Sequence, residues 1–152
     1  MRRKEKEINE YKKIELIMNN AMICRIAMYD GTSPYIVPMN FGYKNRCLYF
    51  HSASTGKKID CIKQNPEICF EIESDCELTG GDKACNFGMK FRSIIGWGTA
   101  EFINDHETKI QALGIIMAAY SKKTFTYDAK AIEKTTVFKV PIKKITGKES
   151  GY

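Results

Sequence analysis

A chain of 152 residues with 43% hydrophobic and 28% charged residues has the length and composition of one globular domain. Its net charge of +6 favours anionic ligands, but the basic residues are mixed with acidic ones along the whole chain, whereas nucleic-acid-binding proteins concentrate them. Because the charged N-terminus has no apolar segment behind it and no apolar run approaches the roughly 20 residues of a membrane-spanning helix, we expect a cytoplasmic protein that binds neither nucleic acid nor membrane.

The first half of the chain predicts one helix followed by three strands. Apolar residues recur at three- and four-residue spacing within residues 5–19, which is typical of an amphipathic helix. Residues 22–28 and 35–43 predict two strands joined by an Asp-Gly turn, and residues 47–52 predict a third. Pro38 cannot donate a hydrogen bond inside a sheet, so we expect the second strand at an edge or at a bulge.

The middle of the chain predicts a short helix and two further strands. The helix, residues 57–65, ends at an Asn-Pro pair, and the alternating residues 68–73 form the next strand. Residues 79–83 are expected to form an exposed loop. Residues 90–103 predict a long strand or a pair of bent strands, in which Gly96 and Gly98 mark a bulge or a close backbone approach.

The last part of the chain predicts a second long helix and a final strand. Asn104 and Glu107 have the residue types of a capping box at the start of that helix. A helical turn near residues 128–133 precedes an alternating strand over residues 136–142. Since helices and strands do not alternate regularly, an antiparallel barrel with peripheral helices fits best. We expect one mainly β domain over residues 1–152, with the N-terminal helical segment, residues 1–20, packed on the barrel.

The six cysteines form no recognisable metal-binding or disulfide pattern. The sequence has no C-x-x-C pair and no Cys/His pair with zinc-finger spacing. Four of them lie inside apolar stretches, where a free cysteine behaves as a small hydrophobic residue. We expect structural thiols and no metal site for Cys24, Cys47, Cys61, Cys69, Cys76 and Cys85.

The junction between the third strand and the following helix, residues 51–58, is the first candidate binding site. A helix N-terminus offers free backbone N–H groups to a phosphate, and the loop adds serine and threonine hydroxyls. Lys57 and Lys58 lie in the first helical turn, where the helix dipole disfavours a positive charge by about 0.3–1 kcal/mol unless an anion is present. The alternative is a serine or threonine N-cap followed by two solvated lysines.

Several runs of sequence resemble one known family when they are taken in order. They are PYIVPMNFGY (34–43), LYFHSA (48–53), GKKID (56–60), NP (65–66), ACNFGMKFRSIIGWGTAE (84–101) and ITGK (145–148). This succession resembles the nitroimidazole-resistance (Nim) branch of the pyridoxamine 5'-phosphate oxidase-like proteins. The resemblance implies a six-stranded antiparallel split barrel that forms a homodimer, with flavin mononucleotide (FMN) in clefts between the subunits.

The resemblance also assigns candidate residues to parts of the cofactor. Residues at four consecutive positions would lie along the flavin ring or its ribityl chain: Val37, Pro38, Met39 and Asn40. His51 and Ser52 would lie near the ribityl-phosphate end, and Lys57 and Lys58 would bind the phosphate. Ser93 matches a position that holds a longer polar residue in related oxidases.

The implied activity is that of an FMN-dependent oxidoreductase acting on a small electron-poor acceptor. The arginine-rich phosphate clamp of true pyridoxamine 5'-phosphate oxidases is reduced here to lysines, so oxidation of pyridoxamine phosphate is not expected. Histidine changes charge near neutral pH, so His51 is the candidate catalytic residue, or else it only hydrogen-bonds the cofactor. Two alternatives stay open: a non-catalytic flavin-binding or stress-related module, and FAD, deazaflavin or haem in place of FMN.

Overall fold

The computed structural model describes residues 2–152, and none of the helices within that range is long and apolar enough to cross a membrane. Its strands are β1 Glu7–Ile8, β2 Cys24–Tyr29, β3 Pro34–Met39, β4 Gly42–Lys44, β5 Cys47–Ala53, β6 Glu67–Thr79, β7 Gly88–Thr99, β8 Glu101–Ile103 and β9 Thr135–Ser150. Its helices are α1 Tyr11–Asn20, α2 Lys57–Gln64, α3 His106–Ala118 and α4 Ala129–Lys134, with 3₁₀ turns at Lys4–Lys6 and Ala84–Asn86.

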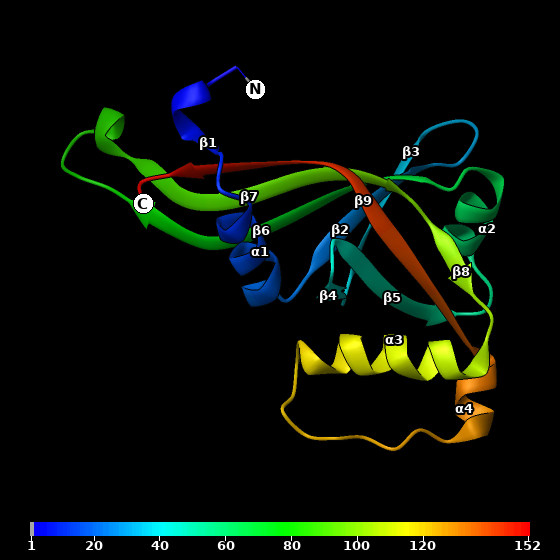
Figure 1. Cartoon of the computed structure of the whole chain (residues 1–152). Helices are drawn as coiled ribbons and strands as arrows, with labels where there is room; N and C mark the ends of the chain where they lie inside the picture. The colour runs from blue at the N-terminus through cyan, green and yellow to red at the C-terminus, as the bar shows by residue number, and fades with distance from the viewer. Residues whose placement is uncertain (1) are drawn as a thin grey trace.

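All the strands of the described chain join one antiparallel sheet in the order β3-β2-β6-β7-β9-β5-β4, with β1 and β8 also paired to β9 (Figure 1). The N-terminal half of β9 pairs with β5, and its C-terminal half pairs with β7. Within residues 2–152 no ladder joins β3 to β4 or β5, although β3 and β4 follow each other in the chain. The barrel is therefore split between these strands, and β3 is an edge strand, as Pro38 predicts.

The core lies inside the curved sheet, and its largest fully buried side chains are phenylalanines. The rings of Phe50 and Phe138 stack with their centroids 5.1 Å apart, and both side chains are fully buried. Burial of one such side chain stabilises the fold by roughly 1.5–3 kcal/mol. Gly96 lies opposite Phe70 in the β6–β7 ladder, and a Cβ atom at Gly96 would approach the Phe70 ring to 2.2 Å. The close approach predicted for this part of β7 is thus confirmed, and the missing side chain makes room for the ring.

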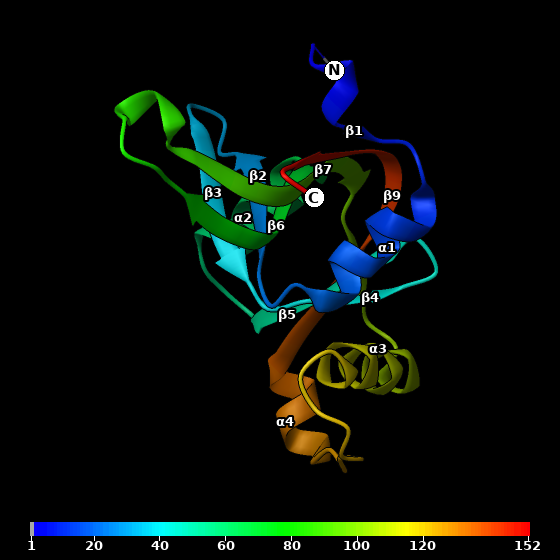
Figure 2. The same cartoon turned by 90° about the vertical axis from the view of Figure 1, so that its left-hand side faces the viewer.

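The helices cover the barrel on two sides. The buried face of α1 carries Ile14, Ile17 and Met18, so the predicted amphipathic helix is confirmed. It begins later than expected, because residues 4–6 form a 3₁₀ turn and Glu7–Ile8 pair with β9. Figure 2 shows α3 lying beneath β4 and β5, on the opposite side of the molecule from the long β6–β7 hairpin.

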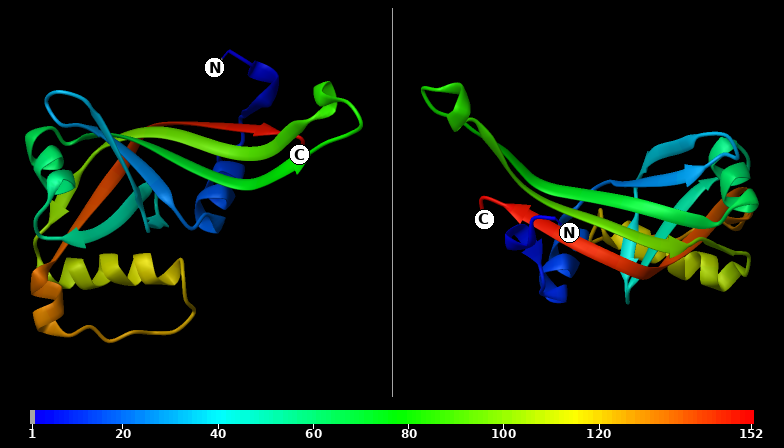
Figure 3. Two further views of the ribbon diagram at one scale, coloured as in Figure 1. Left: turned by 180° about the vertical axis from the view of Figure 1, so that it is seen from behind. Right: turned by 90° about the horizontal axis from the view of Figure 1, so that it is seen from above.

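Other expected boundaries also differ from the structure. The expected strand 35–43 is two strands, β3 and β4, because the chain turns at Asn40 and Phe41. The N-cap of α3 is Asp105 and not Asn104: the Asp105 carboxylate accepts a hydrogen bond from the Thr108 amide at 2.9 Å. The strands β6 and β9 extend to Thr79 and Ser150, well beyond the alternating segments that predicted them. The extra length of β6 and β7 forms a hairpin arm that projects away from the barrel (Figure 3).

The glycines of β7 lead to a stability prediction. A Cβ atom at Gly98 would lie 2.2 Å from the Pro141 carbonyl oxygen, which is backbone and cannot move aside. Gly98→Ala should therefore lower the free energy of unfolding by about 1–3 kcal/mol, the usual cost of overpacking. Gly114→Ala is the control, because a Cβ atom there meets nothing within 4 Å and alanine favours a helix by about 0.5–1 kcal/mol. Urea denaturation should separate the two variants, and equal stability would contradict this account of β7.

Candidate functional site

The loop between β5 and α2 leaves the N-terminus of α2 without a side-chain cap. The N-cap residue is Gly56, whose φ of +121° is accessible mainly to glycine. The alternative of a serine or threonine N-cap is therefore wrong. A Cβ atom at Gly56 would meet nothing within 4 Å, so the space in front of the helix is open. Open backbone N–H groups and the helix dipole make this end of α2 favourable to an anion.

Lys57 is held by the turn between β2 and β3. Its ammonium group lies 2.8 Å from an Asp30 carboxylate oxygen and 4.7 Å from the centre of the Tyr35 ring. The Lys57 ammonium, with the backbone N–H groups of Ser33 and Thr32, holds the pKa of Asp30 well below its ordinary value. Lys57 thus ties α2 to the β2–β3 turn, and its charge is already paired.

Lys58, unlike Lys57, is partly buried and has no carboxylate beside it within the described chain. Its side chain is half-buried, and burial alone lowers its pKa below the ordinary lysine value. Within residues 2–152 no carboxylate forms an ion pair with it. A partly desolvated ammonium group without a counter-charge at an uncapped helix N-terminus is a site where a phosphate would be stabilised.

The four candidate residues of β3 and the following turn do not present their side chains to one side. Val37 packs against the core and Met39 is buried, whereas Pro38 and Asn40 are exposed. The alternation follows from strand geometry, because successive side chains point to opposite faces. A ligand beside β3 would therefore contact the unpaired edge of the strand and the exposed residues Pro38 and Asn40, and not the side chains of all four residues.

His51 and Ser52 also lie on opposite faces of their strand. Ser52 is half-buried and pairs with Thr136 across the β5–β9 ladder. His51 is exposed and lines a cavity of about 350 Å³ next to α3 and α4. The structure therefore brings the imidazole to the cavity beside α3 and α4, and the side chain of Ser52 lies on the other face of the strand.

Ser93 lies far along the sheet from the lysine pair. It occupies the same cross-strand row as Glu73 on β6 and Lys148 on β9. Asn40 lies toward the same end of the sheet, where its amide nitrogen is 3.4 Å from the Met22 carbonyl oxygen. Lys57 and Lys58 thus lie at one end of β3, and Asn40 and Ser93 lie toward the other end. The length of the strand between them is about 20 Å for six residues. They suit an elongated ligand with a phosphate at one end.

Sequence reasoning missed two residues that support this region. The sequence identifies Asp30 only as part of a turn, and nothing in its local pattern indicates the ion pair with Lys57. Tyr120 follows α3, and its hydroxyl accepts a hydrogen bond from the Phe41 amide at 2.8 Å and lies 2.9 Å from the Met22 carbonyl oxygen. The Tyr120 hydroxyl thereby fixes the backbone where the chain passes from β3 to β4, beside the split in the barrel.

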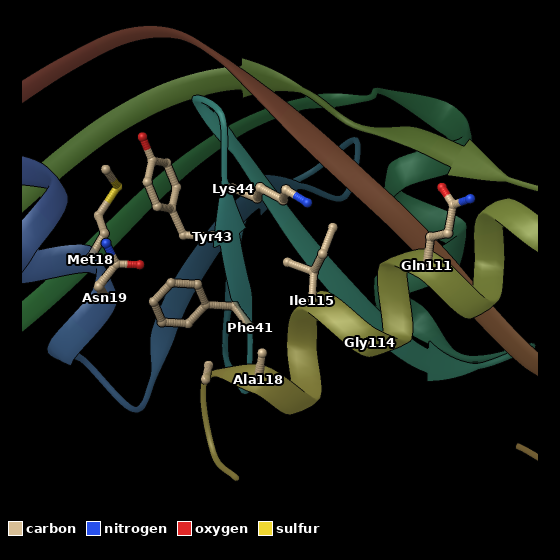
Figure 4. Close-up of a pocket in the computed structure, with 10 residues that line it drawn as sticks. Met18, Asn19, Phe41, Tyr43, Lys44, Gln111, Gly114, Ile115 and Ala118 are labelled. Atoms are coloured by element: carbon tan, nitrogen blue, oxygen red, sulfur yellow. The ribbon is translucent and has the colours of Figure 1, made fainter. Parts of the chain in front are cut away.

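A larger cavity, of about 720 Å³, lies between α1, β4 and α3. Figure 4 shows the rings of Phe41 and Tyr43 directed toward Met18 and Asn19 at the end of α1, with Ile115 and Ala118 contributed by α3. None of the predicted site residues lines this cavity. The candidate site is therefore the split edge of the barrel with the start of α2, together with the smaller cavity at His51.

Comparison with known proteins gives a consistent result. A family profile for pyridoxamine 5'-phosphate oxidase matches residues 10–149. The solved structure of a candidate 5-nitroimidazole antibiotic resistance protein from Bacteroides thetaiotaomicron is 38% identical, with a TM-score of 0.86 over 94% of this chain and 86% of that chain. A search of curated proteins gave no match.

Two more distant structures share the fold. The flavocytochrome Anf3 of Azotobacter vinelandii is 21% identical, with a TM-score of 0.86 over 100% of this chain and 72% of that chain. An FAD-binding protein of Mesorhizobium loti is 20% identical, with a TM-score of 0.69 over 93% of this chain and 96% of that chain. The resemblance seen in the sequence motifs and the split barrel is confirmed: the chain belongs to the pyridoxamine 5'-phosphate oxidase family.

Proposed function

We propose that the protein is a homodimeric, FMN-binding oxidoreductase of the nitroimidazole-resistance type that reduces a small electron-poor acceptor. The observation that carries the proposal is the unpaired, half-buried Lys58 at the uncapped start of α2. Lys58 and the first-turn N–H groups would bind the FMN phosphate, and the exposed residues along β3 would border the rest of the cofactor. The similarity to an FAD-binding protein supports a flavin as the ligand, and the similarity to the Bacteroides protein supports the nitroimidazole-resistance type.

The outer face of the sheet supports a second copy of the chain as the partner. The register places Ile36, Cys69 and Trp97 in one cross-strand row of this face, and Ile95 lies in the next row. Ile36, Ile95 and Trp97 are 59%, 42% and 39% exposed, which is unusual for large apolar side chains so close together. A twofold-related copy would bury this patch against itself, since an isologous interface uses the same surface twice.

When bound, the flavin would supply the redox chemistry, with electrons from a reductant such as a pyridine nucleotide. Reduction of a nitro group consumes protons as well as electrons. The imidazole of His51, exposed at the rim of a cavity, is placed to donate a proton to a molecule held there. If His51 has no such role, the chain is the non-catalytic flavin-binding or stress-related module.

The absorption spectrum of freshly purified protein, with mass spectrometry of the released cofactor, tests the proposal. We expect a yellow protein that releases FMN and that turns over a nitroimidazole when a pyridine nucleotide is supplied. Release of FAD would correct the identity of the flavin, and a Soret band would indicate haem. A colourless protein that takes up no flavin at micromolar concentration would exclude the proposal, and bound FMN without turnover would favour the non-catalytic module.

The two adjacent lysines should differ in their effect on FMN affinity. Lys58→Met should raise the Kd for FMN about 10- to 100-fold, because a charge-assisted bond contributes about 1.5–3 kcal/mol. Lys57→Met should change the Kd much less, since Lys57 is paired with Asp30. Riboflavin, which lacks the phosphate, is the control ligand, and its Kd should be the same for both variants. Equal effects of the two substitutions on FMN would place the phosphate elsewhere.

The pH dependence of FMN binding should follow the lowered pKa of Lys58. The ammonium form binds the phosphate, so affinity is complete below that pKa and is lost as the pH rises through it. Because burial lowers the pKa, the loss should begin below pH 10.5, the ordinary lysine value. Titration of FMN binding by fluorescence quenching should show this decline in the wild type. The decline should be absent in Lys58→Met, and its persistence there would assign it to another group.

The homodimer can be tested by placing a charge on the outer face of the sheet. Ile95→Glu should convert the dimer to a monomer in sedimentation equilibrium, because an unpaired carboxylate would be buried against the partner. Leu16→Glu is the matched control: Leu16 is 61% exposed on α1, away from this face. Dissociation by Leu16→Glu alone would move the interface to α1, and a monomeric wild type would exclude the dimer.

A further inference from the structure

The cavity between α1, β4 and α3 has the size of a small-molecule site and lies outside the proposed flavin site. Its volume is about 720 Å³, within the range of roughly 300–1,000 Å³ that ligand pockets occupy. Apolar residues contribute much of its lining, among them Met18, Phe41 and Ile115. On α3, a Cβ atom at Gly114 would meet nothing within 4 Å, so the helix leaves the cavity open at this point.

The three walls of the cavity are fixed to one another. A Cβ atom at Gly42 would lie 2.7 Å from the backbone of Ile115, so the backbone of β4 packs directly against α3. The Tyr43 hydroxyl donates a hydrogen bond to the Glu15 carboxylate at 2.6 Å, and this bond joins β4 to α1. The cavity is therefore preformed, and a ligand would bind without the cost of ordering its walls.

The polar side chains of the lining include one cation and two amides. Lys44, Asn19 and Gln111 belong to the lining, and among residues 2–152 none of these three side chains has an ion-pair or hydrogen-bond partner. In Figure 4 the Lys44 side chain extends from β4 toward α3, which carries Gln111. No aspartate or glutamate contributes to the lining, and the Glu15 carboxylate is already bound to the Tyr43 hydroxyl.

An unpaired ammonium group beside an apolar surface favours a ligand with one negative charge and an apolar body. The charge would bind Lys44, and the amide groups of Asn19 and Gln111 can donate further hydrogen bonds to its oxygen atoms. The apolar body would cover Phe41 and Ile115 and remove their remaining apolar surface from water. A phosphate monoester carries about two negative charges at neutral pH, whereas the lining offers a single cation. A carboxylate matches that cation in charge.

We propose that this cavity is a binding site for small monocarboxylic acids with an aromatic or aliphatic body. None of the residues proposed to bind the flavin lines it, so the inference goes beyond the proposed function and does not rest on it.

Proton–nitrogen correlation NMR of the purified full-length protein, with the cofactor that it carries, tests the inference with two nearly isosteric probes, 4-phenylbutyrate and 4-phenylbutanamide. We expect the carboxylate to bind about fivefold more tightly than the amide, the contribution of one exposed ion pair, with the largest shifts at Gly114 and Ala118. Lys44→Met should abolish this preference. Lys63→Met, which removes an exposed lysine of α2 outside the lining, should retain it.

Filling the cavity should abolish detectable binding of the carboxylate. Gly114→Phe places a ring in the cavity from a helical position that faces open space. Ala129→Phe, exposed on α4 and outside the lining, is the matched control and should bind normally. If circular dichroism shows that Gly114→Phe misfolds, Ala119→Phe fills the cavity from the end of α3 instead.

Equal affinities for the two probes, or no binding at millimolar concentration, would overturn the inference. Normal binding by the cavity-filling variant would also overturn it, and a preference that survives Lys44→Met would show that the anion does not bind this lysine. Excess FMN should leave the shifts caused by the carboxylate unchanged. Displacement of the carboxylate by FMN would place the acid in the flavin site, which would overturn the inference and leave the proposed function standing. A protein that binds the acid as expected but no flavin would do the reverse.

Discussion

The hydrogen bonding of β9 is the constraint on which the rest of the structure depends. This strand of 16 residues pairs with β5 and β8 through its first half and with β7 and β1 through its second. The sheet must therefore curve around it, and the two ends of the sheet, β3 and β4, come near each other without pairing. Stacked Phe50 and Phe138 lie on the paired strands β5 and β9 and fill the inside of this curve. The split in the barrel is the consequence, and it leaves an unpaired edge beside the start of α2.

Electrostatics distinguish two lysines that are adjacent in the chain. Lys57 and Lys58 follow the same glycine and begin the same helix, yet one is exposed and paired with Asp30, and the other is half-buried and unpaired. Successive helical residues are 100° apart around the axis, so one faces the β2–β3 turn and its neighbour does not. A site that needs one structural cation and one free cation can thus be built from two neighbouring positions.

Strand geometry divides the other candidate residues in the same way. Side chains alternate between the two faces of a strand, so consecutive residues such as His51 and Ser52 face different surroundings. The helices α3 and α4 then border a cavity, lined mainly by apolar residues, on one face only. The end of β5 therefore separates a polar environment, suited to a phosphate, from a mainly apolar one.

The sequence by itself determined the features that depend on neighbouring residues. Alternation, proline and glycine predicted a mainly antiparallel barrel, the edge position of the strand that holds Pro38, and the close approach at Gly96. They also placed the start of α2 at Lys57, and ordered motifs indicated the family. Only the tertiary structure decided which groups meet. The ion pair of Lys57 with Asp30, the Tyr120 hydrogen bonds at the β3–β4 break and the cavity at His51 join residues far apart in the chain. Their pairing depends on how β9 bends the sheet and on how α3 packs on β5, and no local pattern encodes such contacts.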